Sequence, residues 1–149
     1  KLFGTLDASV RALDPDCHPP VVAIDTVGFI SRLPPGLVAS FRSTLEELHE
    51  ADLLLHVVDA SSTQAREQMD VTDRVLSELG VGEKPRMVVL NKVDCILDSG
   101  ARVQARVLAP GAERISAFSK DDVRRLRQRI LDHLNMQQTK YLMMAYLQF

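Results

Sequence analysis

The stretch Val21-Val22-Ala23-Ile24-Asp25-Thr26-Val27-Gly28 decides how the chain folds. Four consecutive apolar residues run into an acid, and a glycine follows three positions later. An unbroken apolar run of this kind is typical of a strand buried on both faces. Open α/β sheets place their ligand sites at the carboxyl ends of such strands, so Asp25 and Gly28 are candidate site residues. Asp25 suits a metal-bound water and Gly28 a nearby phosphate, but both residues also suit an ordinary turn.

Length and charge limit the class of protein. The 149 residues are 46% hydrophobic and predict one domain with a substantial core. The net charge of −2 gives no footprint for non-specific nucleic-acid binding, so we expect no DNA partner, and an RNA-bearing partner would need a local patch. No apolar run is long enough to span a bilayer, so we expect no membrane partner. Cys17 and Cys95 form no disulfide framework, which favours the cytoplasm or an organelle matrix.

Strand-like and helix-like segments alternate along the chain. A strand within residues 2–14 and a turn at 14–20 precede the decisive stretch. Buried strands are expected at 21–25, 53–59 and 86–90, and a short strand at 113–117. Helices are expected at 38–50, 101–108 and 120–134. A further helix should begin at Ser61 or Ser62 and end at Leu79, before Gly80 and Gly82. This alternation predicts a doubly wound, mostly parallel sheet with helices on both faces.

The tetrapeptide Asn91-Lys92-Val93-Asp94 directly follows a predicted buried strand. The Asp94 carboxylate can accept hydrogen bonds from guanine N1–H and the N2 amino group, whereas adenine offers no such donor pair. A good bidentate pair discriminates against the wrong base by roughly 1–3 kcal/mol. The stem of Lys92 can lie along the base, and Asn91 can tie neighbouring loops together. A polar turn between a strand and a helix is the alternative interpretation.

Two weaker signals complete the set. Ser116-Ala117 ends the next predicted strand, and its backbone N–H is a candidate donor to guanine O6. Thr5 offers a hydroxyl that can bind Mg²⁺ beside a γ-phosphate, or simply cap a turn. Neither signal is specific by itself, but the order of the four motifs along the chain is.

This order resembles the translation-factor class of GTPases, and two segments are more specific. Residues 1–7, KLFGTLD, are similar to switch I of the HflX family, and residues 25–34, DTVGFISRLP, are similar to its switch II almost residue for residue. Residues 51–60 also match the next strand of that family. The resemblance covers residues 1–135, a partial G domain, and leaves residues 136–149 as a tail of uncertain structure.

The resemblance implies a P-loop-NTPase-like fold and a GTPase that binds the large ribosomal subunit and splits stalled ribosomes. By analogy, Thr5 binds Mg²⁺ and the γ-phosphate of GTP, Asp25 holds a Mg²⁺-bound water, and the Gly28 N–H contacts the γ-phosphate. The γ-phosphate would order both switch loops, which relax in the GDP state. The implied guanine pocket consists of Asn91, Lys92, Asp94, Ser116 and Ala117.

Phe29 stands where many GTPases have a Gln that orients the attacking water. Phe has no group for this task, so the resemblance implies slow intrinsic hydrolysis and activation by the ribosome. Packing under switch II is an equally compatible role for Phe29. Two further readings therefore stay open: a guanine-nucleotide sensor without useful turnover, and a nucleotide-free interaction module.

The sequence contains no G-x-x-x-x-G-K-[ST] phosphate loop. The HflX family carries that loop before the segment matching residue 1, together with the first strand and first helix, so we expect a cut through a longer protein. The missing strand would lie between 21–25 and 53–59. We therefore predict two unpaired strand edges and weak or no GTP binding by these 149 residues alone. The tail at 140–149 favours a frayed continuation of the last helix, with a strand that covers the gap as the alternative.

Overall fold

The computed structural model describes residues 9–18, 20–26, 46–136 and 141–146. Six strands form one sheet in the order β1-β2-β6-β3-β4-β5, in which β1 is antiparallel to β2 and every other neighbouring pair is parallel. The strands are β1 (Ser9–Ala12), β2 (Val22–Thr26), β3 (Leu53–Asp59), β4 (Arg86–Asn91), β5 (Glu113–Arg114) and β6 (Tyr141–Tyr146). The helices are α1 (Glu46–Glu50), α2 (Ala65–Glu78), α3 (Ser99–Leu108) and α4 (Lys120–Met136), with a 3-10 turn at Val93–Cys95.

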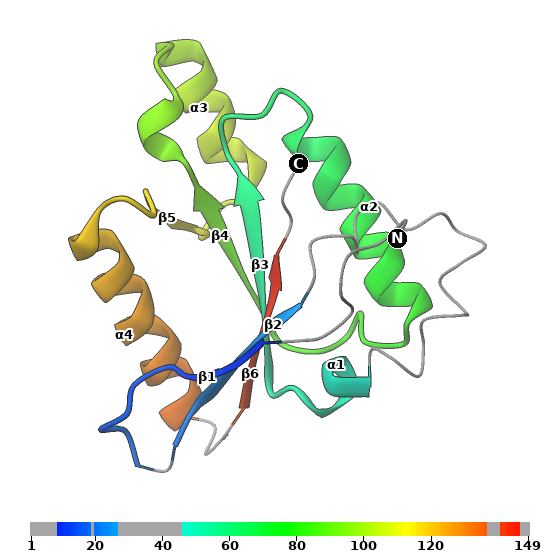
Figure 1. The fold of residues 1–149 in the computed structure, drawn as a ribbon. Helices are drawn as coiled ribbons and strands as arrows, with labels where there is room; N and C mark the ends of the chain where they lie inside the picture. The colour runs from blue at the N-terminus through cyan, green and yellow to red at the C-terminus, as the bar shows by residue number, and fades with distance from the viewer. Residues whose placement is uncertain (1–8, 19, 27–45, 137–140, 147–149) are drawn as a thin grey trace.

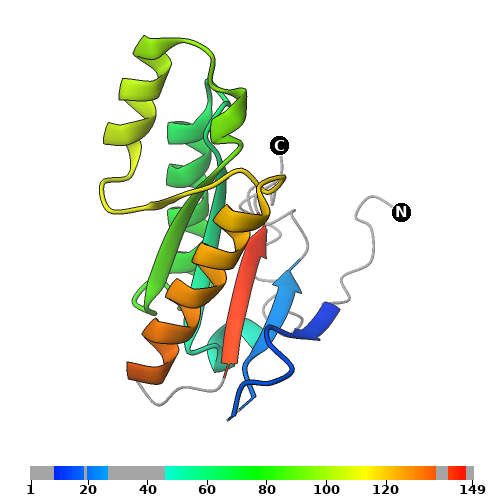
Figure 2. The ribbon, with the colours of Figure 1, turned by 90° about the vertical axis from the view of Figure 1, so that its left-hand side faces the viewer.

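Helices α2 and α4 lie on opposite sides of the sheet (Figure 1; Figure 2). The predicted doubly wound, mostly parallel α/β fold is thus confirmed. Because successive residues of a strand point to opposite faces, one strand supplies both layers of the core. Leu53 and Leu55 of β3 join the α4 side, and Val58 joins the side that includes Ala65 of α2.

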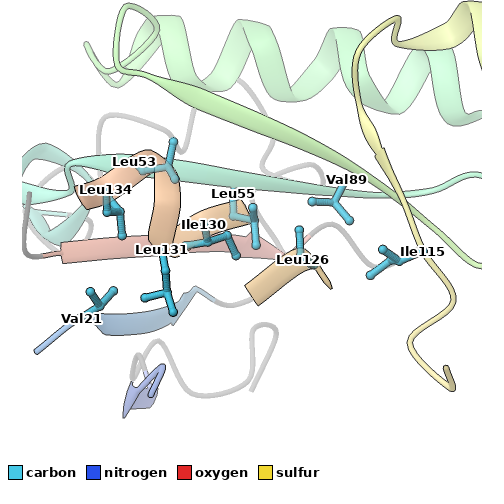
Figure 3. Close-up of a cluster of buried hydrophobic side chains, with 9 residues drawn as sticks. All are labelled: Val21, Leu53, Leu55, Val89, Ile115, Leu126, Ile130, Leu131 and Leu134. Carbon is cyan, nitrogen blue, oxygen red and sulfur yellow. The ribbon is translucent and has the colours of Figure 1, made fainter. Parts of the chain in front are cut away.

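The cluster beneath α4 is the larger of the two (Figure 3). It consists of Val21, Leu53, Leu55, Val89, Ile115, Leu126, Ile130, Leu131 and Leu134. Leu126, Ile130 and Leu134 follow one another at four-residue spacing on α4, which places all three in this core. Val123, three residues before Leu126, is 44% exposed and lies outside this core.

Strand β6 fills the middle of the sheet. It runs parallel to both neighbours and has five registered residue pairs with β2 and five with β3. The prediction of two unpaired edges is therefore wrong, and so is the preferred interpretation of the tail as a continued helix. The alternative, a strand that covers the gap, is confirmed. Its physical reason is that unpaired N–H and C=O groups on two buried edges cost more than ordering one further strand.

Helix boundaries differ from the predictions in detail. Residues 38–45 of the first predicted helix lie outside the described residues, and α1 is Glu46–Glu50. Gln64 rather than a serine precedes α2, and the Ser62 hydroxyl accepts the Gln64 N–H at 3.2 Å in the turn before it. Gly80 ends α2 as predicted, with φ 79° and its N–H donated to the Ser77 carbonyl.

Helix α3 starts two residues earlier than predicted, because Asp98 caps its first turn by accepting the Ala101 N–H at 2.9 Å. Among the described residues, no helix combines the length and the apolar content that crossing a bilayer requires.

Candidate functional site

Backbone hydrogen bonds join the loops at the carboxyl ends of β3, β4 and β5. The Ala60 N–H donates to the Asn91 carbonyl at 2.9 Å, which ties the end of β3 to the end of β4. The Ile115 N–H donates to the Leu90 carbonyl at 2.9 Å, and the Val93 N–H donates back to the Ile115 carbonyl at 3.3 Å. The N-K-x-D and S-A motifs, 22 residues apart from Asp94 to Ser116, therefore lie at one edge of the sheet.

Asn91 closes the two motif loops onto each other. Its side-chain oxygen accepts the Ala117 N–H at 3.0 Å. The prediction that Asn91 ties neighbouring loops together is thus confirmed. The same contact occupies the N–H that was expected to meet guanine O6, so a bound base would have to take over or share this donor. That role of Ala117 stays a prediction.

Lys92 shapes the turn that presents Asp94. Its backbone is left-handed, with φ 64° and ψ 32°, and the Cys95 N–H returns to its carbonyl at 2.9 Å. This conformation costs a non-glycine residue roughly 1–2 kcal/mol, so the hydrogen bonds of the turn must offset it. The Lys92 ammonium lies 3.1 Å from the Asp59 carboxylate. Lys92 was predicted to lie along the base, but its ion pair with Asp59 was not predicted.

Asp59, at the end of β3, has a largely buried carboxylate that stays ionised. Burial acts to raise the pKa of Asp59, but hydrogen bonds from the Ser61 hydroxyl and N–H and from the Lys92 ammonium outweigh it, so the pKa lies below its ordinary value. Those bonds measure 2.6, 3.0 and 3.1 Å. The acid at the end of a buried apolar strand was the available sequence signal for this contact.

Asp94 presents an exposed carboxylate at the rim of the site. The Cys95 thiol lies 3.8 Å from this carboxylate, a long contact, and within the described ranges Asp94 forms no ion pair. Both carboxylate oxygens are therefore available to paired N–H donors such as those of guanine.

Asp122 of α4 fixes the S-A loop, and sequence reasoning missed it. Its carboxylate accepts the Ser116 N–H at 2.9 Å, and its own N–H donates to the Ser119 hydroxyl at 3.2 Å. The Ser116 hydrogen bond is the main reason why the pKa of Asp122 is below its ordinary value; burial opposes it and Arg125 assists it. The S-x-x-D spacing from Ser119 resembles a capping box and was the signal available in the sequence.

The structure brings together the loops of the residues predicted for the guanine pocket, whereas Asp25 lies on a strand farther along the sheet. Asp25 is the fourth residue of β2, in register with Ser9 of β1 and Met144 of β6. Two strands, β6 and β3, separate β2 from β4. Thr5, Gly28 and Phe29 lie outside the described residues. Among those described, no group of three or more His, Cys, Asp or Glu residues could hold a metal ion.

This mostly parallel sheet has the α/β architecture of P-loop NTPases, with the N-K-x-D and S-A loops at the carboxyl ends of its strands. A family profile described as "50S ribosome-binding GTPase" matches residues 1–92, and the chain belongs to this family. Its curated relatives include proteins named GTPase HflX, which confirms the resemblance stated from the motifs.

The identities extend over most of the chain. The protein of Gluconacetobacter diazotrophicus is 50% identical over 131 residues, which cover 88% of this chain and 29% of that protein. The Escherichia coli K12 protein is 42% identical over 103 residues, 69% of this chain and 24% of its own length. The Treponema denticola protein is 38% identical over 135 residues, which cover 89% of this chain and 34% of that protein. The chain thus spans about a third or less of these relatives.

Solved structures agree with the fold. A crystal structure of the SsGBP variant G235S superposes with a TM-score of 0.64 at 26% identity, over 88% of this chain and 47% of that one. The SsGBP variant G235P gives a TM-score of 0.62 at 26% identity, over 86% of this chain and 48% of its own.

Proposed function

We propose that the full-length protein is a GTP-binding and GTP-hydrolysing switch of the HflX type. In this proposal it works in the cytoplasm, associates with the large ribosomal subunit and splits ribosomes. The observation that carries the proposal is the exposed Asp94 carboxylate, presented beside loops that Asn91 closes by its bond to Ala117. Family membership and the HflX relatives support the same activity.

Guanine recognition in this proposal rests on Asp94. Its two oxygens accept N1–H and N2–H of the base, and adenine would leave them without those partners, at a cost of roughly 1–3 kcal/mol. Lys92 covers one face of the base with its aliphatic stem while Asp59 anchors its ammonium. Asp122 accepts the Ser116 N–H and so fixes the S-A loop, from which Ala117 would meet the base.

Phosphate and Mg²⁺ binding would fall to Thr5, Asp25 and Gly28. A hydroxyl and a carboxylate are the oxygen ligands that Mg²⁺ takes, and Mg²⁺ sites use one or two protein oxygens with waters rather than a closed cluster. Asp25 is the fourth residue of the five-residue strand β2. Ligand sites of open α/β sheets lie at the carboxyl ends of strands, which supports a role of Asp25 in Mg²⁺ binding. When bound, Mg²⁺ supplies neutralisation of the β- and γ-phosphate charge.

Phe29 implies that the protein does not orient the attacking water with a Gln of its own at this position. Slow intrinsic hydrolysis and stimulation by the ribosome follow from this. The test is steady-state GTP turnover of the full-length protein, with and without purified 50S subunits, together with gradient sedimentation of 70S ribosomes. Stimulated turnover and GTP-dependent splitting are expected, whereas a turnover that ribosomes leave unchanged would contradict the proposal. Phe29→Ala is expected to leave nucleotide affinity nearly intact.

A second candidate is an interaction module that works without nucleotide. The position of β6 favours it, because β6 occupies the place between β2 and β3 where the family's phosphate-loop strand was expected. Calorimetry with GTP and GDP separates the two. Under the first proposal, residues 1–149 alone bind GTP weakly or not at all while the full-length protein binds it. Micromolar affinity of the 149 residues would contradict that division, and no affinity in the full-length protein would favour the second candidate.

A further inference from the structure

The carboxyl-terminal part of the domain is basic in an otherwise acidic chain. Residues 99–136 contain eight Lys or Arg and four Asp or Glu, a net charge of +4, whereas the whole chain carries −2. Three of these four acids are already neutralised by α4 arginines, in the pairs Arg124–Asp121, Arg125–Asp122 and Arg129–Glu113. The remaining positive charge is therefore concentrated elsewhere, and much of it lies on α3 and β5.

Three of these arginines line one pocket between α3, β5 and the end of β4. The pocket has a volume of about 200 Å³, with Arg102, Arg106 and Arg114 exposed around apolar Leu90, Val93 and Ile96. No carboxylate lines it, and within the described residues none of the three guanidinium groups forms an ion pair.

The backbone and one guanidinium around this pocket are held in place. The Arg102 Nε–H donates to the Ile96 carbonyl at 3.0 Å, which fixes that guanidinium and leaves its other N–H groups free for a ligand. The Arg114 carbonyl accepts an N–H from Arg125 at 3.0 Å, which ties β5 to α4. The pocket is thus supported by α3 and α4 rather than by a loose loop.

The chemistry of the pocket selects its ligand. A guanidinium is a planar fork that matches phosphate and carboxylate oxygens bidentately, and three of them without a counter-charge favour an anion. The volume is below the roughly 300–1,000 Å³ of small-molecule sites, so the pocket suits one group of a larger ligand. Three guanidinium groups around a small apolar floor match one phosphate of a nucleic-acid backbone, with the adjoining sugar against the floor.

We propose that Arg102, Arg106 and Arg114 form a phosphate-binding pocket for the RNA of the ribosomal partner. The choice of RNA over an acidic protein rests on the proposed ribosome association; the anion-binding pocket itself does not. The pocket borders the N-K-x-D loop through Leu90 and Val93, but the side chains proposed to read the base, Asn91 and Asp94, do not line it. It supplies the local basic patch that a chain of net charge −2 needs to meet RNA.

The experiment uses the full-length protein and a fluorescein-labelled single-stranded RNA of mixed sequence, titrated at several salt concentrations. The triple variant Arg102→Ala/Arg106→Ala/Arg114→Ala is compared with the control Lys120→Ala/Arg124→Ala/Arg127→Ala, which removes the same charge from exposed α4 positions. We expect the pocket variant to lose about tenfold or more in RNA affinity and its salt slope to fall by about 2 units, from about 0.7 per phosphate contact. Replacing the three arginines by lysine should restore part of the affinity.

Equal losses in the pocket and control variants would overturn the proposal, because net charge alone would then explain them. Unchanged RNA affinity in the pocket variant would also overturn the proposal. If the same variant lost its affinity for 50S subunits, the pocket would bind an acidic protein surface instead of RNA. GDP affinity, measured in parallel, should be the same in all variants. If the wild type fails to bind 50S subunits, the proposed function fails, and the RNA titration still decides the fate of the pocket.

Discussion

Removal of residues 137–149 should destroy the cooperative fold of the 149-residue chain. The deletion takes β6 out of the middle of the sheet, where it has five registered residue pairs with β2 and five with β3. If each pair corresponds to about one backbone hydrogen bond, with a net value of roughly 0.5–1.5 kcal/mol, the loss is about 5–15 kcal/mol. That range equals the whole unfolding free energy of a typical domain, about 5–15 kcal/mol.

The assay is urea unfolding followed by far-UV circular dichroism, with the full 149 residues as reference. Removing only residues 147–149 is the control, because all registered pairs of β6 remain. We expect the control to keep its urea midpoint and the longer deletion to show no cooperative transition. A longer deletion that unfolds at the midpoint of the reference would refute the reasoning and show that β6 contributes nothing to stability.

Three further predictions concern single side chains. Burial lowers the pKa of His56 from 6.5 to about 4. The unfolding free energy should therefore be unaffected by His56 above pH 6.5 and fall by about 3 kcal/mol as the pH drops to 4. Urea unfolding measures this fall, and in His56→Leu this part of the pH dependence should be absent. Asn91→Ala should weaken GDP binding to the full-length protein about tenfold, since one loop-closing hydrogen bond is lost, and calorimetry on Asn135→Ala should show no change. Ile130→Ala should lower the unfolding free energy by about 2–5 kcal/mol, against about 0.5 kcal/mol or less for the exposed Val123→Ala.

The sequence predicted the elements with strong local signals. The strands at Leu53–Asp59 and Arg86–Asn91 and the helix from Lys120 are those expected from apolar runs and from a four-residue spacing. The N-K-x-D and S-A loops lie together as expected, because each follows a strand of the same parallel sheet. The Asn91 contact to Ala117 was anticipated as a loop tie.

The tail could not be predicted in the same way. The residues of β6 form a strand because β2 and β3 offer two edges that need partners, and such a demand comes from the assembled sheet rather than from the local sequence. Asp122 and the pairing of Lys92 with Asp59 were missed for a similar reason. Each depends on which segments the fold brings side by side.

The proposed function requires that this chain carry the guanine-reading loops of a GTPase. Equilibrium binding of GDP and ADP to the full-length protein, in the wild type and in Asp94→Ala, tests it most directly. We expect the wild type to prefer GDP clearly. In Asp94→Ala this preference should fall by about 5- to 150-fold, from roughly 1–3 kcal/mol of base discrimination. Equal affinities of the wild type for GDP and ADP, or an Asp94→Ala variant that keeps the full preference, would contradict guanine recognition by Asp94.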